Sequence, residues 1–323
     1  MKTLLTKALI GLLFTGSVLA QTEEKVEEPV KKWPTQIIGT KVLGKHTVTE
    51  SEAGFVYETR SYRVRIPEKI ESSLVSNFVI SAESVAYALR SIPLPLYTLK
   101  SADKALIEIS LDEESYLAAG GTKGTAGLFN GRTKKINIQW EHLNRVPAGS
   151  QLLRRPAFDL LVHELTHLCM HGSLWKMETW FAEGVAEYLA AAHLVQGHFD
   201  FTQIDTQIRD HVRNQTGARG SKVQATSIPT LLSLSSREWL RQIAELPPEA
   251  VLQSYTSALI LTHFCFHGGS KRREKVKQYL KDLEQIRDYR QKRPTLFTPA
   301  EAAEIQKKLQ TYWKPKGLQL EFR

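Results

Sequence analysis

The segment from residue 156 to residue 195 constrains the fold most, because it carries titratable side chains within two otherwise apolar helical stretches. Its first part contains the pentapeptide HELTH, which helical spacing places in the middle of a helix. Residues four apart lie on one helical face, so the imidazoles of His163 and His167 can bind one metal ion. Glu164, one step around the helix, can then reach a water molecule bound to that ion.

A catalytic zinc ion takes three protein ligands, so a third ligand must come from elsewhere. The metzincin pattern is excluded, because Met170 and Ser173 stand where it requires Gly and His. The next helical stretch, WFAEGVAEY, places Glu183 and Glu187 on one face of an apolar segment. Buried carboxylates are costly unless a cation or hydrogen bonds compensate. We therefore predict Glu183 as the third ligand and Glu187 as the group that orients an imidazole, with the reverse assignment as the alternative.

Other residues near these motifs have two possible roles each. Tyr255 precedes an apolar helical run and is the candidate donor to a developing oxyanion, or else an aromatic side chain packed on the motif helix. His263 and His267 are also four residues apart, but no Glu follows His263 as Glu164 follows His163. This favours a core or capping pair over a second metal site. His171 is predicted to cap the end of the motif helix at Gly172.

The two cysteines are too few for a disulfide scaffold, so the chain must fold around a hydrophobic core. Cys169 lies two residues beyond His167 and therefore points away from the predicted metal face. A disulfide between Cys169 and Cys265 and a pair of buried free thiols are both compatible with the sequence.

Hydrophobic patterning predicts an α+β fold, with a small mixed sheet and flanking helices followed by a mainly helical part. In the first part the predicted strands lie within residues 55–66, 105–111, 127–130 and 136–140, and the predicted helices at 72–92 and 112–119. In the second part the predicted helices are 156–171, with Pro156 in its first turn, 179–195, 231–245, 248–266, 271–291 and 299–313. Gly184 is expected to let the second of these helices approach the motif helix closely.

The predicted domain spans residues 35–313, divided into an α/β part at 35–150 and a helical part at 151–313. Residues 314–323 are predicted to form a C-terminal tail. Asn130-Gly131 signals a hairpin turn, and the strand at 136–140 is expected either to present its edge to an extended substrate or to be a plain sheet strand.

Residues 1–20 resemble a secretory signal peptide, with Lys2 and Lys7 before an apolar run and Ala20 at the cleavage position. The run is shorter than the ~20 residues of a spanning helix, so no integral membrane span is predicted. Export to the periplasm or the medium is therefore expected, with an uncleaved N-terminal anchor as the alternative. Residues 21–34 are charged and contain proline, which predicts a linker.

The 323 residues carry a net charge of +9, and residues 271–293 contain ten Lys or Arg against four Asp or Glu. This segment could contact an anionic envelope surface, although a solvated helix face is the favoured interpretation. Binding of nucleic acid is not expected, because an exported chain without a recognition motif gives no reason for it.

The motifs HELTH and WFAEGVAEY together resemble the gluzincin peptidases of the peptidase-MA-like group, above all its small bacterial domains. The hairpin AGLFNGRTKKINIQW and the helix YTSALILTHF are similar too, so the resemblance covers about residues 55–283. It implies a zinc ion, a sheet whose edge strand flanks the cleft, and a peptide or protein substrate. This chain departs from the group in its shorter spacing between His167 and Glu183.

The leading hypothesis is an exported zinc metallopeptidase in which Glu164 acts as the general base on a metal-activated water. One rival is a non-catalytic envelope-binding protein that keeps the metal as a structural element, which would not need Glu164. A second rival is a metal-free helical interaction protein, which would not need buried carboxylates.

Overall fold

The structure, a computed structural model, describes residues 32–52, 54–100, 103–143, 158–218 and 220–323. The predicted signal peptide, most of the predicted linker and Pro156 lie outside these ranges.

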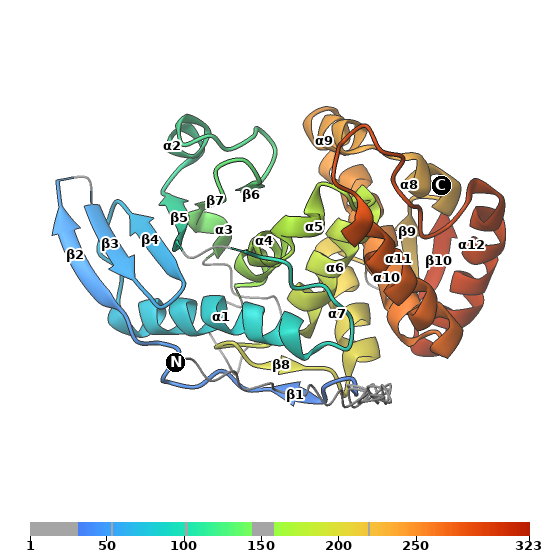
Figure 1. The fold of residues 1–323 in the computed structure, drawn as a ribbon, viewed down its shortest axis with the longest axis horizontal. Helices are drawn as coiled ribbons and strands as arrows, with labels where there is room; N and C mark the ends of the chain where they lie inside the picture. Colours follow the sequence, from blue (N-terminus) through green and yellow to red (C-terminus); the bar gives the residue numbers. More distant parts are fainter. Residues whose placement is uncertain (1–31, 53, 101–102, 144–157, 219) are drawn as a thin grey trace, which may run out of the picture. The chain divides into compact units, whose positions relative to one another are not determined.

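A six-stranded mixed sheet forms the first part of the fold (Figure 1). Its strand order is β2-β3-β4-β5-β7-β6, with β5 parallel to both β4 and β7 and the other pairs antiparallel. The strands are β2 (Thr47–Ser51), β3 (Gly54–Glu58), β4 (Tyr62–Ile66), β5 (Ala105–Ser110), β6 (Gly127–Asn130) and β7 (Lys135–Gln139). The predicted stretch 55–66 is thus a hairpin of two strands, closed by the Thr59 N–H donating to the Tyr62 carbonyl at 2.9 Å.

Helix α1 (Ser72–Ser91) connects β4 to the parallel strand β5 and runs beside the motif helix (Figure 1). The Glu71 carboxylate caps its first turn by accepting the Ser73 N–H at 3.0 Å. Its apolar side chains Phe78, Val85 and Leu89 are buried. The short helices α2 (Glu113–Ala118) and α3 (Trp140–Leu143) complete this part of the chain.

The motif helix is α4 (Asp159–Cys169), which is followed by α5 (His171–Leu174) and α6 (Thr179–Ala192). The predicted end of the motif helix at His171 is wrong, because α4 ends at Cys169. The Cys169 carbonyl at its end instead accepts the N–H groups of Thr98 and Leu99, at 2.9 and 3.0 Å. A Cβ atom on Gly172 would lie 2.5 Å from the Thr98 carbonyl oxygen, so the glycine permits this close passage of two segments.

The remaining helices pack around α10, whose middle and C-terminal residues are buried. They are α7 (Ile204–Thr216), α8 (Ile228–Ser233), α9 (Ser236–Glu245), α10 (Pro248–His267), α11 (Ser270–Gln285) and α12 (Pro299–Trp313). Helix α7 was not predicted, and the single helix predicted at 231–245 is in fact α8 and α9. Ser235 separates these two, because it forms a capping box with Glu238 that starts a new helix.

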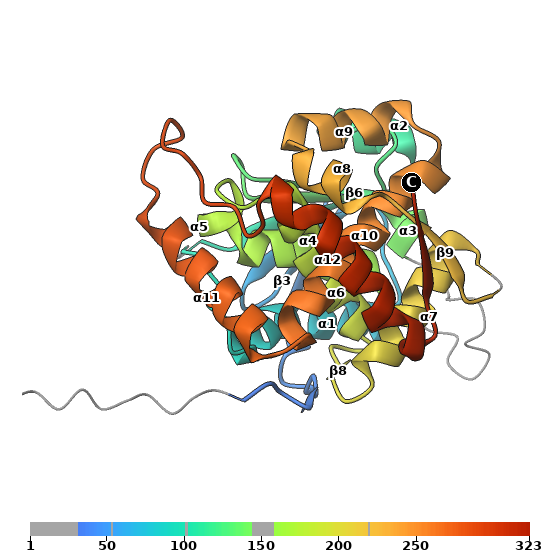
Figure 2. The ribbon, with the colours of Figure 1, turned by 90° about the vertical axis from the view of Figure 1, so that its right-hand side faces the viewer.

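The C-terminal residues belong to the fold, which corrects the prediction of a tail at 314–323. A single 3₁₀ turn (Lys314–Lys316) leads into β10 (Gln319–Phe322), which pairs in parallel with β9 (Lys222–Ala225) (Figure 2). Leu318 between them is fully buried. A second small sheet pairs β1 (Gln36–Ile37) with β8 (Phe199–Asp200).

One cluster of buried apolar residues includes sheet residues such as Ile107 and helical residues such as Leu261. The chain is therefore an α+β protein, as predicted, in which sheet and helices share a core. Within the described ranges, no helix combines the length and the apolar character needed to cross a bilayer.

Candidate active site

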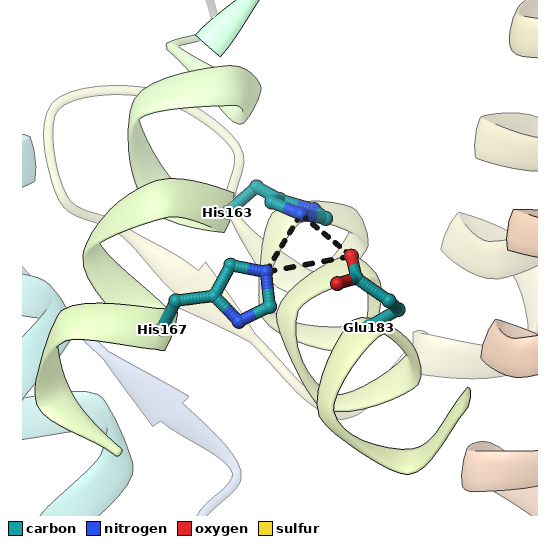
Figure 3. A group of neighbouring side chains, drawn as sticks. All are labelled: His163, His167 and Glu183. Atoms are coloured by element: carbon teal, nitrogen blue, oxygen red, sulfur yellow. Dashed lines mark hydrogen bonds and ion pairs between the residues drawn. The ribbon is translucent and has the colours of Figure 1, made fainter. Parts of the chain in front are cut away.

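Three side chains from neighbouring helices converge in the centre of the fold (Figure 3). His163 and His167 project from the same face of α4, and Glu183 reaches them from α6. The two Nε2 atoms are 3.1 Å apart, and Oε2 of Glu183 lies 3.3 Å from Nε2 of His163 and 3.4 Å from Nε2 of His167. All three side chains are largely buried.

These distances fit a metal ion. Ligand atoms arranged tetrahedrally at about 2.1 Å from zinc would be about 3.4 Å from one another. Three atoms with lone pairs repel at such distances unless a proton or a cation lies among them. The group of His163, His167 and Glu183 could therefore hold a metal ion, and it is the only such group found within the described ranges.

Glu187, one turn beyond Glu183 on α6, lies behind the imidazole of His163. Its Oε1 is 2.8 Å from Nδ1 of His163, which leaves Nε2 of that ring to face the other two ligand atoms. Its Oε2 is 2.9 Å from both Nε2 of His211 and Nε2 of Gln215. Burial alone would raise the pKa of Glu187, but the hydrogen bonds from His163 and His211 outweigh it and hold the pKa below its usual value.

The structure thus places Glu183 beside both imidazoles and Glu187 behind one of them, in the positions predicted for their roles. Sequence reasoning missed His211 and Gln215, which lie four residues apart on α7. That spacing was a usable signal, since it puts two polar groups on one helical face, but nothing in the sequence linked that face to Glu187.

Glu164 lies beside the ligand group in the same cavity. Burial raises the pKa of its carboxyl, and the negative charge of Glu183 adds to this effect. The two histidines and the backbone N–H of Phe129 act in the opposite direction. A raised pKa brings a carboxylate closer to the range in which a general base works best near neutral pH.

The cavity over these residues has a volume of about 370 Å³. The strand β6 forms one wall through Leu128 and Phe129. The helix α9 also lines the cavity, through Trp239, Leu240 and Ile243. The cavity thus combines mainly apolar walls with a floor of metal-binding groups, which is typical of small-molecule and peptide sites.

The strand on the cavity is β6, not the predicted strand 136–140. The latter corresponds to β7, which lies between β5 and β6 and has both edges paired. The Gln139 N–H donates to the Ala126 carbonyl, so antiparallel alternation turns the backbone groups of Leu128 toward β7. The backbone groups of Gly127 and Phe129 therefore point away from the sheet, at its free edge.

His171 does not cap α4 as predicted. It lies in α5, and its Nε2 is 2.8 Å from the carbonyl oxygen of Gly131 in the turn between β6 and β7. The contact therefore connects the end of the edge-strand hairpin to the motif helix region.

Tyr255 on α10 lines the same cavity, with its ring centroid 6.1 Å from that of His163 and 5.1 Å from that of Trp239. Burial raises the pKa of its hydroxyl well above the usual value, and Glu183 adds to the shift, so the group stays protonated and can donate. This position is compatible with both roles predicted for Tyr255, and its role stays a prediction.

The remaining histidines and cysteines lie apart from the ligand group. Nε2 of His263 is 2.9 Å from Asp205, and Nε2 of His267 is 2.9 Å from the Tyr188 hydroxyl, which matches the predicted core pair. Cys169 and Cys265 are buried free thiols, so the structure has no disulfide between them.

Fold and site together define an α+β protein with a buried His-His-Glu group able to hold a metal ion. Comparison of the chain with protein-family models, curated proteins and solved structures finds no match.

Proposed function

We propose that this chain is a zinc-dependent peptidase with Glu164 as its general base. The observation that carries the proposal is that Glu164 and the group of His163, His167 and Glu183 line one cavity beside a free strand edge. The resemblance of HELTH and WFAEGVAEY to gluzincin peptidases points to the same chemistry.

Zinc is the metal that this donor set favours, because two imidazoles and one carboxylate form a three-ligand catalytic site with an open position. When bound, zinc polarises a carbonyl oxygen and lowers the pKa of water toward 7. The contact of Glu187 with Nδ1 of His163 directs the opposite ring nitrogen at the ion.

In the proposed reaction, Glu164 accepts the proton of the attacking water and later delivers it to the leaving amine. The Tyr255 hydroxyl is the candidate donor to the oxygen that becomes negative. An extended peptide would bind along β6 as an added strand, using the outward backbone groups of Gly127 and the carbonyl of Phe129, since the Phe129 N–H already donates to Glu164. These three contributions come from α4, α10 and the sheet edge.

The N-terminal sequence supports a site of action outside the cytoplasm, secreted or periplasmic. N-terminal sequencing of the exported chain would check this, and a mature chain beginning at Gln21 is expected.

The variant Glu164→Gln tests the general base. We expect the zinc-loaded variant to lose at least about a hundredfold in kcat on a broad peptide library, because the amide cannot accept a proton. Its zinc content should stay at that of the wild type, since Glu164 is not a ligand. Zinc content is measured by metal analysis, and cleavage by mass spectrometry.

The companion variant Glu183→Gln should lose zinc affinity as well as activity, which separates a ligand from a base. Native cleavage rates in Glu164→Gln would refute the base assignment. A zinc-loaded wild type that cleaves no peptide would instead favour the rival hypothesis of a non-catalytic envelope-binding protein with a structural metal.

A further inference from the structure

An exposed tryptophan stands at the edge of the cavity with positive charges around it. Trp175, in the connector from α5 to α6, lines the cavity yet keeps 42% of its surface exposed. The Lys176 ammonium lies 5.5 Å from the centre of its ring, and the Arg293 guanidinium lies 5.7 Å from it. These distances are within the range of cation–π attraction.

The arginine belongs to the segment between α11 and α12, which two hydrogen bonds fix beside the connector. The Lys176 ammonium donates to the Leu283 carbonyl at 3.1 Å, and the Leu296 N–H donates to Glu178 at 2.7 Å. Figures 1 and 2 both show this segment passing close to α5. The positive charges of Lys176 and Arg293 are therefore held by the fold beside Trp175, which lines the cavity.

The positive charge at this place is largely uncompensated. Burial lowers the pKa of Lys176, and nearby Arg287 and Lys100 lower it further, against the opposite effect of Glu284. Within the described ranges, no ion pair forms at Arg287, Arg293 or Lys100, while three cations of the basic segment, Lys275, Lys277 and Arg290, do pair with carboxylates. An unpaired group of cations beside a substrate cavity attracts negative charge.

We propose that Trp175, Lys176, Arg287 and Arg293, here named the cationic rim, select peptide substrates that carry an acidic side chain a few residues from the cleaved bond. This inference rests on the proposed peptidase function and names its substrate class. The ring of Trp175 supplies an apolar surface for the stem of the acidic residue, and the exposed guanidinium groups of Arg287 and Arg293 pair with its carboxylate. The ammonium of Lys176 is buried on the Leu283 carbonyl and contributes positive charge rather than a direct contact.

A peptide is favoured over an anionic membrane surface because Trp175 lines the same cavity as the metal-binding group. Along α11 itself several basic side chains already have partners, such as Lys275 with Glu301 and Lys277 with Glu274. The basic segment 271–293 therefore has unpaired cations beside Trp175, at Arg287 and Arg293, as well as along the surface of α11.

The test compares two charge-reversed proteins. Arg287→Glu/Arg293→Glu changes the rim, and Lys271→Glu/Lys307→Glu makes the same change in net charge at exposed lysines outside the rim. The zinc-loaded full chain is given fluorogenic peptides that differ only in Glu, Gln or Lys at one position at a time. The wild type should favour Glu over Lys at one position, through KM.

In the rim variant the ratio of kcat/KM for the Glu peptide to kcat/KM for the Lys peptide should fall by about tenfold, through KM. The control variant should keep the wild-type preference, and raised salt should weaken it in the wild type. Equal cleavage of the Glu, Gln and Lys peptides by the wild type would overturn the inference and leave the peptidase function standing.

Binding separates this inference from the proposed function. The zinc-loaded Glu164→Gln protein is titrated with the same peptides, and preferential binding of the Glu peptide supports the rim even if no peptide is cleaved by the wild type. In a last measurement, binding of the wild type and of the rim variant to vesicles containing phosphatidylglycerol is compared. Vesicle binding that the rim variant loses, without any preference among the peptides, would overturn the peptide proposal in favour of an anionic surface.

Discussion

At the residue scale, Gly127 sets how closely the edge strand approaches the proposed base. A Cβ atom at this position would lie 3.0 Å from Oε1 of Glu164 and 3.1 Å from its Cγ. The absence of a side chain therefore lets β6 lie against the carboxylate that must reach the substrate.

The variant Gly127→Ala should displace Glu164 while leaving the metal ligands in place. The added Cβ requires Glu164 to move by a few tenths of an ångström. Since a shift of about 1 Å in a reacting group can cost about a hundredfold in rate, we expect kcat to fall by roughly threefold to tenfold. Zinc affinity, measured with a competing chelator, should be unchanged.

The matched control is Gly131→Ala on the same hairpin, where the nearest atom to the added Cβ is 3.9 Å away on the Phe129 ring. This control should keep its kcat. Wild-type kcat in Gly127→Ala would show that the close approach is not needed for catalysis.

At the element scale, Gly184 acts at a different interface from the one expected. The sequence suggested that it lets α6 approach the motif helix α4. A Cβ atom on Gly184 would in fact lie 2.1 Å from Oγ1 of Thr262 and 2.4 Å from the carbonyl oxygen of Ala258, both on α10. The glycine thus permits close packing of α6 on α10.

The variant Gly184→Ala should force α6 and α10 apart and lower the free energy of unfolding by about 1–3 kcal/mol, the usual cost of overpacking. Urea denaturation measures the change. Gly220→Ala is the control, because nothing lies within 4 Å of its added Cβ. Equal midpoints for Gly184→Ala and the wild type would contradict this account of the interface.

At the scale of the whole molecule, the core pair of buried His263 and half-buried His267 makes stability depend on pH. Burial lowers the pKa of His267 to about 3, and the nearby His263 adds to the shift. Arg273 and Lys316 act in the same direction, whereas Asp205 opposes them. In the unfolded chain the same imidazole titrates near ~6.5.

In the unfolded state His267 therefore binds a proton below pH ~6.5, whereas in the folded state it does not bind one until about pH 3. Stability contributed by neutral His267 is complete above this window and falls as the pH drops through it. The slope is at most about 1.4 kcal/mol per pH unit.

We expect His267→Gln to lack this component, so its unfolding free energy should fall less steeply between pH 6.5 and pH 4.5. Both proteins are measured by urea denaturation in the metal-free form, which removes the effect of acid on metal binding. Parallel curves for the two proteins would argue against a neutral buried His267.

Much of the fold followed from local patterns. The period of apolar residues predicted α1, α6 and α10 nearly to their ends, and alternation with turn signals predicted β5 and the β6–β7 hairpin. It was also predictable that His163 and His167 share one helical face and that Glu183 and Glu187 share another, because residues four apart on a helix share a face whatever surrounds it. The sequence by itself thus determined which groups can meet along one helix.

Only the tertiary structure decided what those faces meet. It placed β6 rather than β7 at the free edge, brought His211 to Glu187, ended α4 at Cys169 against Thr98, and set Arg293 beside Trp175. These contacts join segments far apart in the chain, and they depend on how whole elements pack. Helical and strand periodicity is a property of neighbouring residues, so it carries no information about such distant partners.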